Sequence, residues 1–108
     1  MQDFIFIYIT CRNVEEARQI GKSLVQDRLV ACINILNNVE SIYCWNDKIE
    51  EDTEVILIAK SNLSLYQEIE QRVKSLHSYT NPCIIYYKID GGSKIYLDWI
   101  NHSIHRGT

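Results

Sequence analysis

The chain has 108 residues, which corresponds to one domain with room for a hydrophobic core. Hydrophobic residues make up 46% and charged residues 23%, with only four glycines and one proline, so disordered, collagen-like and linker proteins are excluded. The formal net charge of -3 argues against a nucleic acid or an anionic membrane surface as a partner. The longest apolar run, residues 4–9, is too short to span a bilayer.

The cysteines bear on the cellular compartment. Cys11, Cys32, Cys44 and Cys83 show no CxxC spacing, so the patterns of zinc ribbons and thioredoxin-type redox sites are absent. The first residues lack the basic start and long apolar stretch of a signal peptide. We therefore expect a cytoplasmic protein with reduced thiols, most of them small core residues. Import into an organelle through a trimmed transit peptide stays open.

The first third of the chain predicts strand, helix and strand. Residues 4–9 are β-branched and aromatic, which is typical of a strand buried on both faces. Asn13 with Glu16 forms a capping box for a helix over residues 14–27, where apolar residues recur at helical spacing. A second strand is expected over residues 29–36.

The middle of the chain predicts one long, bent hairpin. Asn37-Asn38 marks a break or bulge, and the strand signal resumes over residues 39–45. Asn46-Asp47-Lys48 is typical of a tight turn. Residues 53–60 then return as a strand that is apolar on both faces.

The last third predicts helix, strand and helix. Ser64 with Gln67 forms a second capping box, which starts a helix over residues 65–76. A last strand is expected over residues 83–89, and Ser93 is positioned to cap a short third helix.

The resulting order, β-α-β-β-α-β followed by a helix, predicts an α+β fold: a ferredoxin-like sandwich in a single domain, residues 1–108. In such a fold two helices cover one face of the sheet. The two central strands are apolar on both faces, and an open apolar face of several hundred Å² is rare on a soluble monomer. We expect another copy of the chain to cover it, with the third helix covering a part.

Two nucleotide-related motifs are set aside. Gly21-Lys22-Ser23 resembles the end of a phosphate-binding loop, but Glu16 stands where that motif needs a glycine, and the segment lies within a predicted helix. Sheets that bind RNA carry stacking aromatic residues on their third strand, and residues 53–59 have none.

His77 and Cys83 form the candidate metal pair. His77 ends the predicted second helix, Cys83 begins the last strand, and the turn at Asn81-Pro82 can bring the two together. Imidazole and thiolate suit Cu(I), Cu(II) or Zn(II), although two ligands are too few for a closed structural site. Chemistry alone favours a helix-end histidine and a core cysteine. His102 and His105 on the terminal helix offer an adventitious site, and solvated side chains are the favoured interpretation there.

Two further charged segments have alternative interpretations. Arg12 and Asn13 at a helix N-terminus resemble the anion site of acylphosphatase-type enzymes, while a capping asparagine beside a solvated arginine is the favoured alternative. The acidic hairpin residues are a weak attraction for divalent cations and are more simply a solvated turn. They are Asp47, Glu50, Glu51, Asp52 and Glu54.

Several segments, in order and at matching spacing, resemble the CutA divalent cation tolerance family over essentially the whole chain. They are Arg28-Leu29-Val30-Ala31-Cys32-Ile33-Asn34-Ile35, Ser41-Ile42-Tyr43-Cys44-Trp45, Lys48-Ile49-Glu50, Glu54-Val55, Lys60, His77-Ser78-Tyr79 with Asn81-Pro82, and Tyr96-Leu97-Asp98-Trp99-Ile100.

The resemblance implies a ferredoxin-like fold and a tight homotrimer whose long hairpins pair with neighbouring subunits. It implies tolerance to divalent cations, especially copper, without a defining enzymatic activity. No cofactor is then required, and a Cu or Zn ion is the ligand to expect. Tyr43 and Trp45, near the hairpin tip, are the residues to which the resemblance assigns assembly.

The family's assembly is similar to that of PII signal proteins, which bind effectors between subunits. The alternative function is therefore recognition of a small anionic effector in an intersubunit pocket lined by Trp45, Lys60, Tyr79 and Trp99. The sequence also departs from the family pattern, with Ser78 in place of a proline and Cys83 in place of a glutamate. Exchange of an oxygen for a sulfur ligand either abolishes the metal site or shifts it towards Cu(I).

Overall fold

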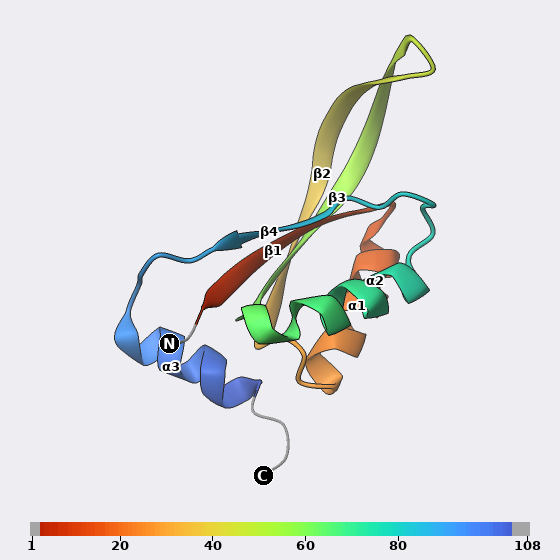
Figure 1. Cartoon of the computed structure of the whole chain (residues 1–108). Coiled ribbons are helices and arrows are strands. Elements are labelled where there is room, and N and C mark those ends of the chain that lie inside the picture. The colour runs from red at the N-terminus through yellow and green to blue at the C-terminus, as the bar shows by residue number, and fades with distance from the viewer. Residues whose placement is uncertain (1–2, 105–108) are drawn as a thin grey trace.

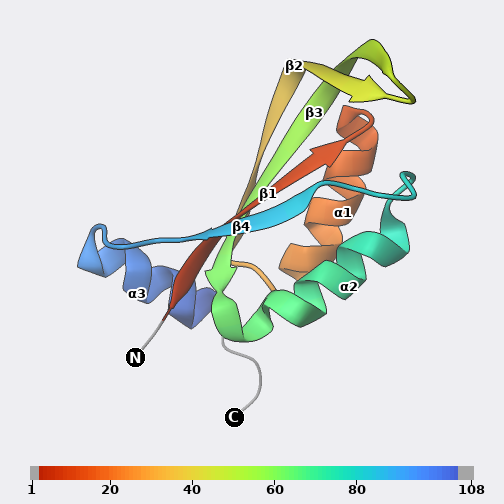
Figure 2. The same ribbon diagram turned by 45° about the horizontal axis from the view of Figure 1, so that its top comes forward.

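The computed structural model describes residues 3–104, which form one four-stranded antiparallel sheet with helices beside it. The elements in chain order are β1 (Phe4–Cys11), α1 (Val14–Gln26), β2 (Cys32–Trp45), β3 (Lys48–Asn62), the 3-10 helix η1 (Leu63–Leu65), α2 (Tyr66–Leu76), β4 (Ile84–Lys88) and α3 (Lys94–Ser103). The strand order is β2-β3-β1-β4, and α1 and α2 lie together on one face (Figure 2). The predicted ferredoxin-like α+β topology is confirmed.

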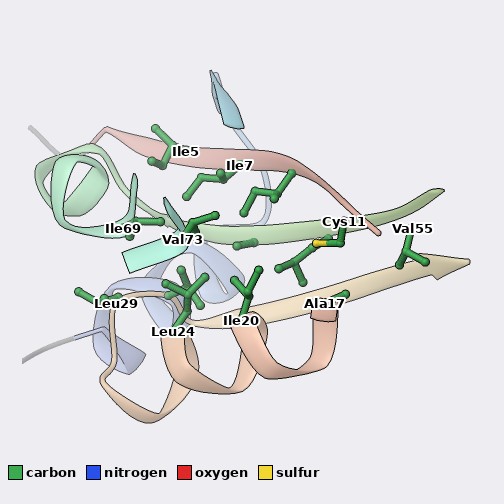
Figure 3. Close-up of a cluster of buried hydrophobic side chains, with 14 residues drawn as sticks. Ile5, Ile7, Cys11, Ala17, Ile20, Leu24, Leu29, Val55, Ile69 and Val73 are labelled. Atoms are coloured by element: carbon green, nitrogen blue, oxygen red, sulfur yellow. The ribbon is translucent and has the colours of Figure 1, made fainter. Parts of the chain in front are cut away.

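The core lies between the sheet and α1 with α2 (Figure 3). In β1 the inward side chains Ile5, Ile7, Ile9 and Cys11 have no accessible surface, while their neighbours in the strand are only half-buried. The prediction that this strand is buried on both faces is therefore wrong for the single chain. Its period of two is hidden in the sequence because both faces carry apolar residues.

The hairpin of β2 and β3 is the longest feature of the molecule, whose largest extent is 49 Å (Figure 1). Its register slips between Leu36 and Val39, which confirms the predicted bulge. Asn46 and Asp47 close the tip with positive φ values of 52° and 62°, a conformation that suits a two-residue hairpin turn. β3 therefore begins at Lys48, earlier than predicted.

Helix caps account for most other boundaries. Asn13 accepts a hydrogen bond from the backbone N–H of Glu16 at 2.8 Å, as predicted. The predicted cap at Ser64 is wrong, because the Asn62 side chain accepts from the Ser64 N–H and starts η1 before α2. In β2 the strand begins only at Cys32, since the chain leaves α1 through a turn at Arg28 with a φ of 56°.

The glycine at position 21 is explained by close packing of α1 against the sheet, not by phosphate binding. It lies within α1, and a Cβ added there would stand 2.5 Å from Cδ1 of Ile33 on β2. The glycine therefore lets the helix approach the sheet closely, which supports the structural interpretation of the Gly21-Lys22-Ser23 segment.

The second face of the sheet remains largely open in the single chain. α3 lies at the end of the sheet remote from the hairpin tip, where it buries Ile100 (Figure 1). Leu36, Ile85 and Tyr87 on the open face stay 48%, 44% and 58% exposed. The part of the chain that the structure describes thus presents an apolar face that α3 does not cover.

The Asn13 cap predicts a defined loss of stability on truncation. Asn13→Ala should lower the free energy of unfolding by about 1 kcal/mol, because the N–H of Glu16 loses its acceptor. Urea unfolding followed by circular dichroism measures this. Asn101→Ala, an exposed position within α3, is the matched control and should leave stability nearly unchanged. Equal losses in the two variants would contradict the capping role.

Candidate functional site

The candidate site lies where the end of β1 meets the loop between α2 and β4. The backbone of Thr10 connects the two segments, because both its carbonyl and its N–H form hydrogen bonds with the loop. Its carbonyl oxygen accepts a hydrogen bond from His77 Nε2 at 2.6 Å, and its N–H donates to the Cys83 carbonyl oxygen at 3.2 Å. The strand end therefore fixes both residues of the predicted metal pair.

The imidazole of His77 is fully buried and fully bonded. Nε2 must carry the proton, because its partner on Thr10 is a carbonyl, which can only accept. Nδ1 then accepts from the Tyr79 N–H at 3.0 Å. The ring is held in one tautomer by two backbone groups, with Nδ1 as the nitrogen that carries the lone pair.

Glu16 brings a carboxylate to the same place. Its oxygens accept from the backbone N–H groups of Arg12 and Ser78, each at 2.9 Å, and Oε1 lies 3.9 Å from His77 Nδ1. Burial alone would raise the pKa of Glu16. The hydrogen bonds from Arg12 and Ser78, with the nearby His77, outweigh burial and lower that pKa.

Cys11 completes a cluster of three donor types. One ligand atom each from Cys11, Glu16 and His77 lie within 4.8 Å of one another. Burial raises the pKa of the Cys11 thiol to about 12, and the charges of Glu16 and Glu54 add to this. The thiol is therefore protonated at neutral pH, and an ion bound there must displace its proton.

The sequence does not indicate Cys11 and Glu16 as site residues, because it predicts a core position for the first and a capping role for the second. A signal was present. The alternation along β1 puts Cys11 on the helix-facing side at the strand end, next to the first turn of α1.

A cavity of about 600 Å³ opens at Thr10, between the loop and the hairpin, and Cys11, Glu16 and His77 are not among its lining residues. Its lining is acidic and aromatic: Thr10, Tyr43, Trp45, Glu50, Asp52, Glu54, Tyr79, Thr80, Asn81 and Cys83. Cys83 faces this cavity, whereas His77 is not among the lining residues. Burial, and then the charge of Glu54, raises the pKa of the Cys83 thiol.

Tyrosine hydroxyls hold two of these carboxylates. The Tyr79 hydroxyl donates to Glu54 at 2.9 Å, and burial together with this bond raises the pKa of Tyr79. The Tyr43 hydroxyl donates to Asp52, which raises the pKa of Tyr43 to about 12. Both phenols therefore remain neutral donors at physiological pH.

The residues predicted for an effector pocket lie in two places within one chain. Trp45 and Tyr79 line the cavity. Lys60 lies near the other end of the hairpin, where its Nζ donates to the Tyr96 hydroxyl at 3.3 Å. Trp99 lies beside Tyr96, with ring centroids 5.5 Å apart. Within a single chain, these four side chains therefore do not line one pocket.

The remaining candidates have local roles or lie outside the described residues. The Asn13 side chain serves as the N-cap, and the shallow depression around Arg12 is also lined by Glu15 and Glu54, whose charges disfavour an anion. His102 is exposed on α3. His105 lies outside residues 3–104.

Fold and site together define an α+β chain of ferredoxin-like topology with thiol, imidazole and carboxylate donors at one sheet end. The family model described as "CutA1 divalent ion tolerance protein" matches residues 5–103, and the chain belongs to this family. The resemblance found in the sequence is thereby confirmed.

Individual relatives agree with this assignment. The divalent-cation tolerance protein CutA of Archaeoglobus fulgidus is 42% identical over 92% of this chain and 96% of that protein. The chloroplastic protein CutA of Arabidopsis thaliana is 38% identical over 92% of this chain, which spans 54% of that longer protein. The solved structure described as the periplasmic divalent cation tolerance protein CutA of A. fulgidus superposes with a TM-score of 0.91 at 41% identity, over 94% of this chain and 99% of that one.

None of the helices within residues 3–104 is both long enough and apolar enough to cross a membrane.

The Glu16 network predicts a specific pH dependence. A carboxyl whose pKa is lowered by folding contributes stability above its unfolded pKa, and this contribution is lost as the pH falls through the folded pKa. From neutral pH to below the ordinary glutamate value of 4.5, Glu16→Gln should therefore lose less stability than the wild type. Thermal unfolding across that range measures it. Glu15→Gln, one residue away and exposed, should follow the wild type. An unchanged acid dependence in Glu16→Gln would contradict the role of this carboxylate.

Proposed function

We propose that the protein acts in divalent cation tolerance as a non-enzymatic homotrimer that binds a divalent metal ion through His77. Membership of the CutA1 family and the names of its relatives support the cation response. The observation that carries metal binding is the grouping of Cys11, Glu16 and His77.

The donor set favours a particular class of ion. Sulfur and imidazole nitrogen suit copper and zinc, and they disfavour magnesium and calcium, which prefer oxygen ligands. Histidines that bind metals usually donate their second ring N–H to a carbonyl or carboxylate. The bond from His77 Nε2 to the Thr10 carbonyl already has this form, so Nδ1 is the ligand atom once the Tyr79 N–H gives way.

Two cysteines compete for the role of sulfur ligand. Cys11 is favoured because its sulfur lies within 4.8 Å of a donor atom of His77. Cys83 is the sequence-based choice, and it offers a route from the cavity, whose carboxylates attract cations. In either arrangement the thiol must lose its proton, so affinity falls as the pH is lowered.

Calorimetric titration with Zn(II) and Cu(II) separates these arrangements. His77→Ala should weaken binding at least about tenfold, and Cys11→Ser should do the same. His102→Ala, on the exposed face of α3, is the control and should bind as the wild type. Loss with Cys83→Ser but not with Cys11→Ser would overturn the Cys11 arrangement and assign Cys83. Equal binding by wild type and all variants would overturn the site.

Assembly into a homotrimer is supported by apolar surface that the single chain leaves exposed. Ile42, Trp45 and Ile49 on the outer hairpin are 65%, 59% and 70% exposed, in addition to the open sheet face. Ile42 and Ile49 lie on one face of the hairpin and Trp45 lies on the other, and exposed apolar surface marks interaction sites. An obligate interface typically buries about 2,000 Å² or more, and a long projecting hairpin offers such an area.

Trp45→Ala should lower the free energy of assembly by about 2 kcal/mol, because exposed aromatic anchors often carry interface energy. Light scattering after size exclusion over a dilution series measures the trimer and its dissociation. Lys22→Ala, exposed on α1, is the control and should remain trimeric. A folded wild-type monomer at micromolar concentration would contradict the proposed assembly.

Two further parts of the proposal rest on single observations. All four cysteines are unpaired, which fits a reducing compartment such as the cytoplasm. The Asn13 side chain caps α1, so it is not free to bind an anion, which supports a protein without acylphosphatase activity. Turnover of an acyl phosphate would contradict this.

The effector alternative requires neighbouring subunits to bring Lys60 and Trp99 to Trp45 and Tyr79. Tight binding of an anionic metabolite, abolished by Lys60→Met, would establish it.

A further inference from the structure

The open face of the sheet carries opposite charges at its two ends. Lys60 lies on this face at the end near α3 (Figure 1), because its cross-strand partner Phe6 alternates with the buried residues of β1. Asp52 and Glu54 follow the same alternation along β3, and both line the cavity with Thr10 at the end towards the hairpin tip. The face therefore has a cationic end and an acidic end.

The Lys60 ammonium has no carboxylate as a partner within the described chain. Its Nζ donates to Asn34 Oδ1 at 3.1 Å and to the Tyr96 hydroxyl at 3.3 Å, and it lies 3.7 Å from the Cys32 sulfur. None of the ion pairs within residues 3–104 includes Lys60. Burial would lower the pKa of Lys60, but the contacts with Tyr96 and Cys32 outweigh burial and raise it, so the charge is kept.

The carboxylates at the acidic end are held by hydroxyl groups and not by cations. Tyr79 donates to Glu54 at 2.9 Å, and Tyr43 donates to Asp52. Among the described residues that line the cavity there is no lysine, arginine or histidine. The cavity itself therefore does not balance the negative charge at this end of the face.

The two ends cannot neutralise each other within one chain. Lys60 follows Glu54 by six positions in β3, which is about 20 Å along an extended strand. Asp52 lies farther still from Lys60. A lysine and a glutamate side chain together do not span this distance, so a contact between the two ends needs two chains.

We propose that in the homotrimer Lys60 of each subunit reaches the acidic cavity of its neighbour and pairs with Glu54 and Asp52 there. This inference rests on the proposed assembly, in which another copy covers the open face. A covered face loses its water, and a charge without a partner is then costly to bury. A closed ring of three joins two different surfaces of each subunit, so the cationic end of one copy meets the acidic end of the next at every contact.

The pairing has a consequence for function. The alternative function assigns Lys60 to a small anionic effector, but an ammonium that is already paired with two carboxylates is not free to bind one. Charge pairing across the interface therefore favours the cation response over the effector alternative, and it fixes the direction in which the subunits follow one another in the ring.

Charge reversal at both ends tests the pairing. Lys60→Glu and Glu54→Lys should each raise the concentration at which the trimer dissociates at least about tenfold, because like charges then meet. The double variant restores opposite charges and should dissociate near the wild-type concentration. Lys22→Glu, the same reversal at an exposed position of α1, is the control and should leave dissociation unchanged. Light scattering after size exclusion over a dilution series measures each variant, and circular dichroism checks its folding.

A second pair of variants guards against a folding defect. Glu54→Lys loses the hydrogen bond from Tyr79, so Asp52→Lys is combined with Lys60→Glu as well. A wild-type monomer would overturn the homotrimer and the pairing together. A wild-type trimer would leave the homotrimer in place, and the pairing would be overturned if Lys60→Glu dissociated as Lys22→Glu does, or if neither double variant assembled better than Lys60→Glu alone.

Discussion

The buried hydrogen bond from His77 Nε2 to the Thr10 carbonyl joins the centre of the sheet to the loop after α2. β1 pairs with β3 on one side and with β4 on the other, so its end is a fixed point. The Glu16 carboxylate ties the first turn of α1 to the same point through the Ser78 N–H. Two segments far apart in sequence, residues 10–16 and residues 77–78, are therefore held together by buried polar groups, and the side chains of His77 and Glu16 also belong to the proposed metal site.

Burial and charge together set the thiol chemistry at one end of the sheet. Burial, followed by the charges of Glu16 and Glu54, raises the pKa of Cys11, and burial followed by the charge of Glu54 raises that of Cys83, which keeps these sulfurs protonated without a metal. The same carboxylates favour a cation, so ion binding and proton release are coupled there.

Local signals in the sequence predicted much of the fold. The Asn13 cap and the turn at Asn46-Asp47 are short-range features, and both follow from side chains that bond to or tolerate the local backbone. The Ser64 cap failed because Asn62 two residues earlier is an equally good acceptor, and the sequence does not rank the two. The burial of Phe4–Ile9 was misjudged because an apolar run hides its own alternation when the outer face is also apolar.

The site was only partly predictable for a related reason. His77 stood out as a helix-end histidine, but its neighbours Cys11 and Glu16 come from β1 and α1, and tertiary packing alone decides which residues meet there. The same limit applies to Lys60, whose contacts with Cys32 and Tyr96 depend on the strand register and on the placement of α3. The order of the elements predicted the topology, and the resemblance to the family indicated a cation response, while the departure at Cys83 left the ligand set to be decided by geometry.

The central claim is that the ion is held by the imidazole of His77 together with a cysteine sulfur. X-ray absorption spectroscopy of the zinc-loaded protein tests it most directly, because it counts sulfur and nitrogen neighbours of the metal without any substitution. The account predicts a mixed first shell, with a zinc–sulfur distance of about 2.3 Å and a zinc–nitrogen distance of about 2.0 Å. A shell of oxygen ligands alone would contradict it and would move the ion to the carboxylates of the cavity.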